Sequence, residues 1–196
     1  MHYRPGQLAR LLRSVPERIS IVVVNQVGQS GKVDEQTQEI DSRTRCFTYA
    51  ETGLSRSRNR LLEHASGDFL LVCDDDIVFS HDAFEALEDA LERHPREDVF
   101  TFMMTDEAGA LRKKYAAEEF VHDKWSISRV SSCEIGFRRK SVSNAALQFD
   151  ERFGLGASYP LGEEVAFLKD CLDRGLRARF VPAIISAHPM YSTGHR

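Results

Sequence analysis

Short apolar runs alternate along the chain with stretches in which apolar residues recur every three or four positions. The apolar runs, which predict buried strands, lie at 19–24, 45–49, 69–73, 99–104, 131–137 and 179–181. The stretches with helical spacing, which predict amphipathic helices, lie at 5–12, 54–65, 82–93 and 163–174. The polar stretch at 25–44 is expected to form a loop. Because strands and helices alternate, we expect an α/β domain with a mostly parallel central sheet.

The composition is that of one ordinary globular domain. The 196 residues include 26 Lys and Arg against 30 Asp and Glu, which gives a formal net charge of −4 and a pI of about 6.0. This balance disfavours a nucleic-acid-binding protein. No apolar run approaches the ~20 residues of a membrane-spanning helix, and the N-terminus lacks the apolar core of a signal peptide. We therefore expect a single cytoplasmic domain over residues 1–196 with no nucleic-acid partner.

The four cysteines are spread through the chain at Cys46, Cys73, Cys133 and Cys171, with no Cys-x-x-Cys pair. Cys73 and Cys171 lie within apolar patterns. This usage predicts reduced, buried thiols and excludes a disulfide framework or a zinc site of the Cys-pair type.

Three consecutive carboxylates, Asp74, Asp75 and Asp76, follow the apolar run at 69–73. They should stand at the carboxyl edge of the sheet, where open α/β sheets bind ligands. Adjacent carboxylates repel one another unless a cation is present, and Mg²⁺ or Mn²⁺ commonly joins carboxylates to substrate phosphates. Alternate residues of an extended segment point the same way, so Asp74 and Asp76 are expected to act together. A solvated acidic loop is the alternative.

A basic segment precedes this strand. Gly53 and Ser55 are predicted at a helix N-terminus, where anions bind readily. Arg56 and Arg60 share one face of the helix, with Arg58 about 160° away from that face. The alternative to an anion site is a solvated basic face.

Three further positions are candidates. Glu163 and Glu164 open the last helix, where they either compensate its dipole or provide a general base on a rigid support. His188 follows the last predicted strand and is either a structural histidine or a metal ligand. Trp125, the only tryptophan, is either a sugar-stacking wall or a core residue.

Two segments together resemble a known family. GLSRSRNRLLEHASGDFLLVCDDDIVF, at 53–79, resembles the part of family 2 glycosyltransferases in which a G-x-S-x-A-R-N helix leads to a strand ending in a D-x-D motif. IGFRRKSV and then FDERFGLGASYPLGEEVAFLKDCLDRGLRARFVP resemble the family's later segment, in which F-D-E-x-F precedes a G-E-D helix. The resemblance covers roughly residues 7–190, with the motifs in matching order. Within the family, the sequence resembles bacterial members tied to capsule and other surface polysaccharides.

The resemblance implies a three-layer GT-A fold and a metal-dependent, inverting transfer of a sugar from a nucleotide sugar, most readily a UDP-sugar, to a glycan or lipid-linked acceptor. It is compatible with peripheral association at the inner face of the membrane and with a homo-oligomer. Glu164 stands where the family usually has an Asp as catalytic base, and the longer side chain shifts the geometry. The other implied roles are the donor site for Asn25, Arg56, Asp74 and Asp75, the acceptor site for Glu163 and Trp125, and the Mn²⁺ or Mg²⁺ ion for Asp76 and His188.

The resemblance departs from the family at the N-terminus. Family members open with a central strand of the P-x-x-S-V-I-I-P-T-Y-N-R kind, whereas this sequence begins at the helix that follows it. We therefore expect a domain truncated at its N-terminus, in which the runs at 19–24 and 69–73 flank the position of a missing strand. Either these two runs pair directly, or the N-terminal segment separates from the sheet. Open strand edges of this kind also favour self-association.

Two alternative functions stay open. The missing strand, together with Asn25-Gln26 where a D-D-G-S turn often stands, fits a catalytically impaired nucleotide-sugar-binding or scaffold module. A nucleotidyltransferase would need a Gly-rich phosphate loop, for which residues 28–32 are a candidate without the Walker spacing.

Overall fold

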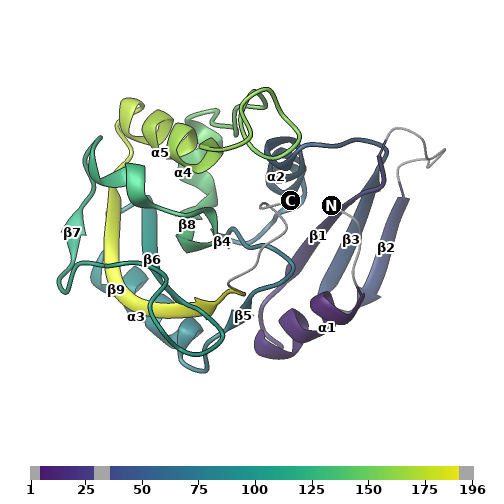
Figure 1. Ribbon diagram of the computed structural model, residues 1–196, viewed down its shortest axis with the longest axis horizontal. Helices are drawn as coiled ribbons and strands as arrows, with labels where there is room; N and C mark the ends of the chain where they lie inside the picture. The colour runs from purple at the N-terminus through teal and green to yellow at the C-terminus, as the bar shows by residue number, and fades with distance from the viewer. Residues whose placement is uncertain (1–4, 29–35, 190–196) are drawn as a thin grey trace.

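The structure is a computed structural model that describes residues 5–28 and 36–189, and it contains two β-sheets with helices packed against them. The smaller sheet lies at one end of the molecule and the larger sheet at the other, with α2 between them (Figure 1). Apart from Gly28, the candidate phosphate loop at 28–32 lies outside the described residues. No helix within the described ranges is long and apolar enough to cross a membrane.

The smaller sheet has the strand order β1-β3-β2, with β1 parallel to β3 and β2 antiparallel to it. Its strands and adjoining helices are α1 (Pro5–Ser14), β1 (Ile21–Gln26), β2 (Gln36–Asp41), β3 (Thr44–Tyr49) and α2 (Leu54–His64). The expected loop at 25–44 therefore contains a strand, and that expectation was wrong. Strand β2 was not predicted because its side chains are polar. An edge strand of this kind is held in the sheet by backbone pairing.

The larger sheet has the order β4-β8-β6-β9-β5, and β7 also pairs with β9. Its strands are β4 (Phe69–Leu71), β5 (Val78–Phe79), β6 (Val99–Thr105), β7 (Phe120–Val121), β8 (Ile135–Arg138) and β9 (Ala178–Ala187). Among these pairs only β6 and β9 run parallel. The α/β class is confirmed, but the single, mostly parallel sheet is corrected to two mixed sheets.

Strand β6 separates two hydrophobic cores. Val99 belongs to the core on one face, whereas Phe100 and Phe102 belong to the core on the other. This division follows from the alternation of side chains along a strand. The helices divide likewise, because α1 and α3 contribute to the core of Phe100, and α4 and α5 to the core of Val99. The remaining helices are α3 (Ala83–Arg93), η1 (Ser126–Arg129), η2 (Ser132–Glu134), α4 (Arg139–Asn144) and α5 (Glu163–Asp173).

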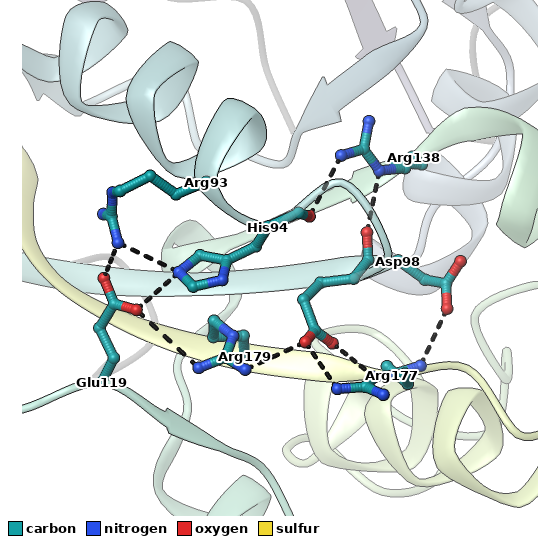
Figure 2. A network of polar contacts seen from close by, with 8 residues as sticks. Arg93, His94, Asp98, Glu119, Arg138, Arg177 and Arg179 are labelled. Carbon is teal, nitrogen blue, oxygen red and sulfur yellow. Dashed lines mark hydrogen bonds and ion pairs between the residues drawn. The ribbon is translucent and has the colours of Figure 1, made fainter.

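A network of charged side chains joins the turn before β6 to the start of β9 (Figure 2). Glu97 is 3% exposed and accepts hydrogen bonds from Arg177 at 2.9 Å and from Arg179 at 3.1 Å. Burial alone would raise the pKa of Glu97, but the two guanidinium groups outweigh it and hold that pKa below its ordinary value. Asp98 also accepts from the backbone N–H of Arg177 at 2.9 Å. The network fixes the start of the strand that leads to His188.

The two strands expected to flank a missing one do not pair with each other. In the described part of the chain, β1 pairs with β3 and β4 pairs with β8, so each stands at the end of its own sheet. Direct pairing of these two strands is therefore not found: β1 belongs to the smaller sheet, whereas α1 packs into the core on one face of the larger sheet.

Candidate functional site

The aspartate segment leaves the carboxyl end of β4, as the sequence predicts. Asp74 places a carboxylate oxygen 3.8 Å from Nη2 of Arg58, and Asp76 places Oδ1 3.4 Å from Nε2 of His188. Asp75, between them, is half-buried. Asp74 and Asp76 therefore meet different partners, although both lie at the same edge of the sheet.

His188 is held in an orientation that leaves one nitrogen facing this edge. Its Nδ1 donates a hydrogen bond to the backbone oxygen of Pro189 at 2.8 Å, so this nitrogen carries a proton. Nε2 then faces Asp76 Oδ1, a buried oxygen without a hydrogen-bond partner among the described residues. A proton on Nε2 or a cation between the two atoms would make this contact favourable. One imidazole nitrogen and one carboxylate oxygen also suit a Mn²⁺ or Mg²⁺ ion.

A cysteine that sequence analysis did not select lies beside these groups. Ligand atoms of Asp74, Cys133 and His188 all lie within 4.8 Å of one another. Burial raises the pKa of the Cys133 thiol well above its ordinary value, so the thiol stays neutral. Sulfur is a soft ligand, whereas Mg²⁺ and Mn²⁺ prefer oxygen, so the carboxylates suit such an ion better than Cys133 does.

Arg58 connects the aspartates to helix α5. It is 3% exposed, and its Nη1 donates a hydrogen bond to Glu163 Oε1 at 2.7 Å. Its guanidinium lies 5.4 Å from the centre of the Phe149 ring. Arg56, and not Arg58, was predicted as a site residue. The position of Arg58 on the helix, opposite the exposed arginines, nevertheless indicates that Arg58 faces the interior.

The exposed arginines lie outside this cluster. Arg56 pairs with Glu151 at 3.0 Å, and Arg60 pairs with Glu63 at 3.0 Å. Their placement matches the alternative of a solvated basic face. The N-terminus of α2 is also engaged, because the N–H of Leu54 donates to the backbone oxygen of Leu155 at 2.9 Å. One of the N–H groups that could bind an anion there is therefore occupied by the loop at 152–162, and the anion site stays a prediction.

Helix α5 presents two adjacent glutamates to the site. Glu163 is buried and bound to Arg58. Glu164 is half-buried, and its Oε2 has no hydrogen-bond partner within the described ranges. Burial raises the pKa of Glu164, and the charge of Glu163 adds to that effect. A carboxylate with a raised pKa and a free oxygen is suited to accept a proton.

Two other predicted site residues lie on β1 and directly before η1. Asn25, near the end of β1, donates to Thr48 Oγ1 at 3.5 Å. Trp125 is 85% exposed, and its neighbour Lys124 pairs with Asp173 at the far end of α5. Asp173 follows Glu164 by nine residues, which is roughly 14 Å along a helix. The roles of Asn25 at the donor and Trp125 at the acceptor stay predictions.

The fold and this edge of carboxylates define an α/β domain of the glycosyltransferase class. The family model of glycosyl transferase family 2 matches residues 2–145, and the chain belongs to that family. A comparison with curated proteins finds no match. The family predicted from the sequence motifs is confirmed.

Solved structures show the same fold. The crystal structure of S. aureus TarS 1–349 has a TM-score of 0.68 and 14% identity, and the match covers 96% of this chain and 58% of that one. The structure of TarS 1–349 in complex with UDP-GlcNAc has a TM-score of 0.67 and 16% identity, with 96% and 56% covered. The chain therefore spans less than two thirds of the TarS chains that it resembles.

Proposed function

We propose that this domain transfers a sugar from a UDP-sugar to a hydroxyl group of a glycan or lipid-linked acceptor, with inversion at the anomeric carbon. The observation that carries the proposal is the set of contacts that joins Arg58 to Asp74 and Glu163 and joins His188 to Asp76, with Glu164 next to Glu163 and within the influence of the charge of Arg58. Family membership supports the reaction class, and the UDP-GlcNAc complex of TarS supports the choice of donor.

Asp76 and His188 are the residues that would hold a divalent cation. Such an ion supplies positive charge that offsets the diphosphate of the leaving nucleotide. Asp74 and Asp75 flank the same edge and are assigned to the nucleotide end of the donor. Arg58 keeps Asp74 and α5 together, so it acts as a positioning residue.

Glu164 is assigned as the base. It takes the proton of the acceptor hydroxyl while the acceptor oxygen forms a bond to the anomeric carbon and the bond from that carbon to the diphosphate breaks. The leaving group departs as UDP with both electrons of that bond, and the proton remains on Glu164. The raised pKa of Glu164 makes it a stronger base than an exposed glutamate.

The loop before α5 is a surface for the acceptor. Tyr159 is 58% exposed and Leu161 is 77% exposed, and both stand close in sequence to the glutamates. Exposed apolar side chains beside a polar site fit a sugar ring or the lipid part of an acceptor. This placement favours the 152–162 loop over Trp125 as the acceptor side.

The test is ligand stabilisation with UDP-GlcNAc and Mn²⁺, in the native chain and in Asp76→Asn. At ligand concentrations of 100 times Kd, the native chain gains about 2.7 kcal/mol of unfolding free energy. We expect Asp76→Asn to lose the Mn²⁺-dependent part of this gain, whereas the exposed carboxylate control Asp68→Asn keeps it. Equal stabilisation of Asp76→Asn and the native chain would show that Asp76 does not hold the ion.

Release of UDP separates the enzyme from the alternative of an impaired binding module. An enzyme releases UDP from bound UDP-sugar when acceptor is present. Stabilisation by donor and Mn²⁺ without UDP release, over a panel of glycan and lipid-linked acceptors, would favour the binding module.

A further inference from the structure

Three different kinds of metal ligand meet at the edge of the larger sheet, and each comes from a different part of the chain. Cys133 lies in η2, Asp74 follows β4 and His188 follows β9. One ligand atom from each residue lies within 4.8 Å of the other two, and within the described ranges no other three donors of this kind lie so close together. Cys133 is 4% exposed and His188 is 6% exposed, so the sulfur and nitrogen donors are buried.

The spacing of these atoms fits a small tetrahedral ion. Zn²⁺ bonds to sulfur at about 2.3 Å and to nitrogen or oxygen at about 2.0–2.2 Å, which places its ligand atoms about 3.3–3.8 Å apart. Atoms within 4.8 Å of one another reach that separation when the widest gap closes by about 1 Å. Asp74 is able to make this movement, because its carboxylate lies 3.8 Å from the Arg58 guanidinium, which is longer than a hydrogen bond.

Cys133 lies on a turn that buried hydrogen bonds hold in place. The next residue, Glu134, is 2% exposed and accepts hydrogen bonds from Lys113 Nζ at 2.7 Å and from the Tyr115 hydroxyl at 2.6 Å. Glu134 also accepts from the backbone N–H of Ser131 at 3.0 Å, which closes the turn around Cys133. A ligand on a backbone that is fixed in this way is already in position to bind.

His188 has the orientation of a metal ligand. Its Nδ1 donates to the backbone oxygen of Pro189 at 2.8 Å, and a backbone acceptor of this kind commonly fixes a metal-bound histidine. Arg112 Nη1 donates to the same oxygen at 2.8 Å, so that acceptor is itself held. Among the described residues, Nε2 has an ion-pair contact with Asp76 and no hydrogen bond, which leaves this nitrogen available to an ion.

The set of donors favours a softer ion than Mn²⁺ or Mg²⁺. Sulfur and imidazole nitrogen suit Zn²⁺, and sites of this kind bind Zn²⁺ more tightly than Mn²⁺. The thiol proton of Cys133 passes to solvent when the metal–sulfur bond forms, so the thiolate and the Asp74 carboxylate together balance the charge of a divalent ion. Burial raises the pKa of the Cys133 thiol, whereas the Arg58 guanidinium and the backbone N–H of Asp74 oppose this rise.

We propose that Asp74, Cys133 and His188 form a Zn²⁺ site with an open fourth position. His188 is also assigned to the Mn²⁺ or Mg²⁺ ion at Asp76, and its one available nitrogen binds a single ion at a time. Zn²⁺ therefore excludes Mn²⁺ from His188 and inhibits the transferase. The Zn²⁺ site stands on the geometry of its donors, whereas the competition rests on the proposed function.

The test uses Co²⁺, which takes the coordination of Zn²⁺ and whose absorption reports its ligands. Titration of the native chain should give the thiolate-to-cobalt charge-transfer band and the strong visible bands of a tetrahedral site, and Zn²⁺ should abolish both. Cys133→Ala should lose the charge-transfer band and bind Co²⁺ at least about 100-fold more weakly, since even the loss of an outer partner of a ligand costs about 10–100-fold. Cys73→Ala is the matched control, because Cys73 directly precedes Asp74 and its variant should keep the band.

A second measurement needs no substitution, so it does not depend on the folding of a variant. The ¹¹³Cd NMR shift reports how many sulfur atoms bind the ion, and Cd²⁺ replaces Zn²⁺ at sites that contain thiolate. The native chain should show one resonance with the shift expected for one sulfur ligand.

The competition is measured separately, by electron paramagnetic resonance of free Mn²⁺ without any nucleotide sugar. Zn²⁺ at about ten times its Kd should raise the apparent Kd for Mn²⁺ about ten-fold in the native chain. The same Zn²⁺ concentration should leave the Mn²⁺ affinity of Cys133→Ala almost unchanged.

Two results would overturn the Zn²⁺ site. The first is a native Co²⁺ or ¹¹³Cd spectrum without a sulfur ligand, and the second is a charge-transfer band that persists in folded Cys133→Ala. Binding of Zn²⁺ through Cys133 with no change in Mn²⁺ affinity would refute the competition and keep the site. Failure of the native chain to bind Mn²⁺ at all would count against the proposed function and leave the Zn²⁺ site standing.

Discussion

Glu163 and Glu164 are consecutive residues on one helical turn, yet they meet opposite surroundings. Glu163 is buried against Arg58, and its charge is compensated by a hydrogen bond of 2.7 Å. Glu164 has a buried oxygen without a partner among the described residues, and burial raises its pKa. A carboxylate whose charge is compensated by a buried arginine therefore holds the site together, whereas a carboxylate without such a partner is available for proton transfer.

The largest expected effect comes from Glu164→Gln. Loss of a general base should lower turnover by about 10²–10⁴-fold while donor affinity stays unchanged. Single-turnover rates and donor titrations measure the two quantities separately, and the exposed Glu118→Gln is the matched control. If affinity collapses and the rate of bound donor persists, Glu164 is a binding residue.

Glu163→Gln should act on the fold instead. The variant keeps an oxygen that can accept from Arg58 but removes the negative charge of Glu163, and loss of one charge of a buried ion pair destabilises by about 3 kcal/mol. Denaturant unfolding measures this loss. A stability equal to that of the native chain would show that Arg58 does not depend on Glu163.

The pH dependence of stability sharpens the contrast. The folded-state pKa of Glu164 is raised above its unfolded value, so the associated stability is present below the unfolded pKa and is lost as pH rises through the folded pKa. Glu164→Gln cannot ionise, so it should match the native chain in acid and become the more stable chain near neutral pH. Melting temperatures of both chains from pH 4 to 8 measure this divergence. A constant difference across the range would contradict the raised pKa.

The smallest expected effect comes from Trp125→Ala. This exposed side chain lies toward the far end of α5, so unfolding free energy should change by no more than about 0.5 kcal/mol. Turnover with a short acceptor should also change less than about two-fold. A large rise in the KM for a longer acceptor, with kcat unchanged, would restore Trp125 to the acceptor site.

The sequence predicts those parts of the fold whose signal is local. Continuous apolar runs located β4 and most of β6, and helical spacing located α2, α3 and α5. Strand β2 was missed because its side chains are polar, and β5 and β7 were missed because two-residue strands carry no pattern. The antiparallel pairings depend on which distant strands meet, which local patterns do not encode.

The same distinction applies to the site. The strand-end rule correctly placed Asp74 and Asp76 at one edge of a sheet. Cys133 joined them without any spacing signal, because it comes from a different element of the chain. The angular position of Arg58 on the helix indicates that it faces the interior, whereas Arg56 was predicted as a site residue because of its charge alone.

The Glu97 network has a consequence for how sequences of this family diverge. Glu97 is buried against Arg177 and Arg179, so losing the carboxylate alone leaves Arg179, which is mostly shielded from water, with only the longer contact to Glu119. Losing Arg179 alone weakens the compensation of a buried anion. Substitutions at 97 and 179 should therefore be inherited as a pair, through intermediates that are less stable than either end point. Relatives with an apolar residue at 97 are expected to have lost the arginine at 179 as well, while the more exposed 177 varies freely.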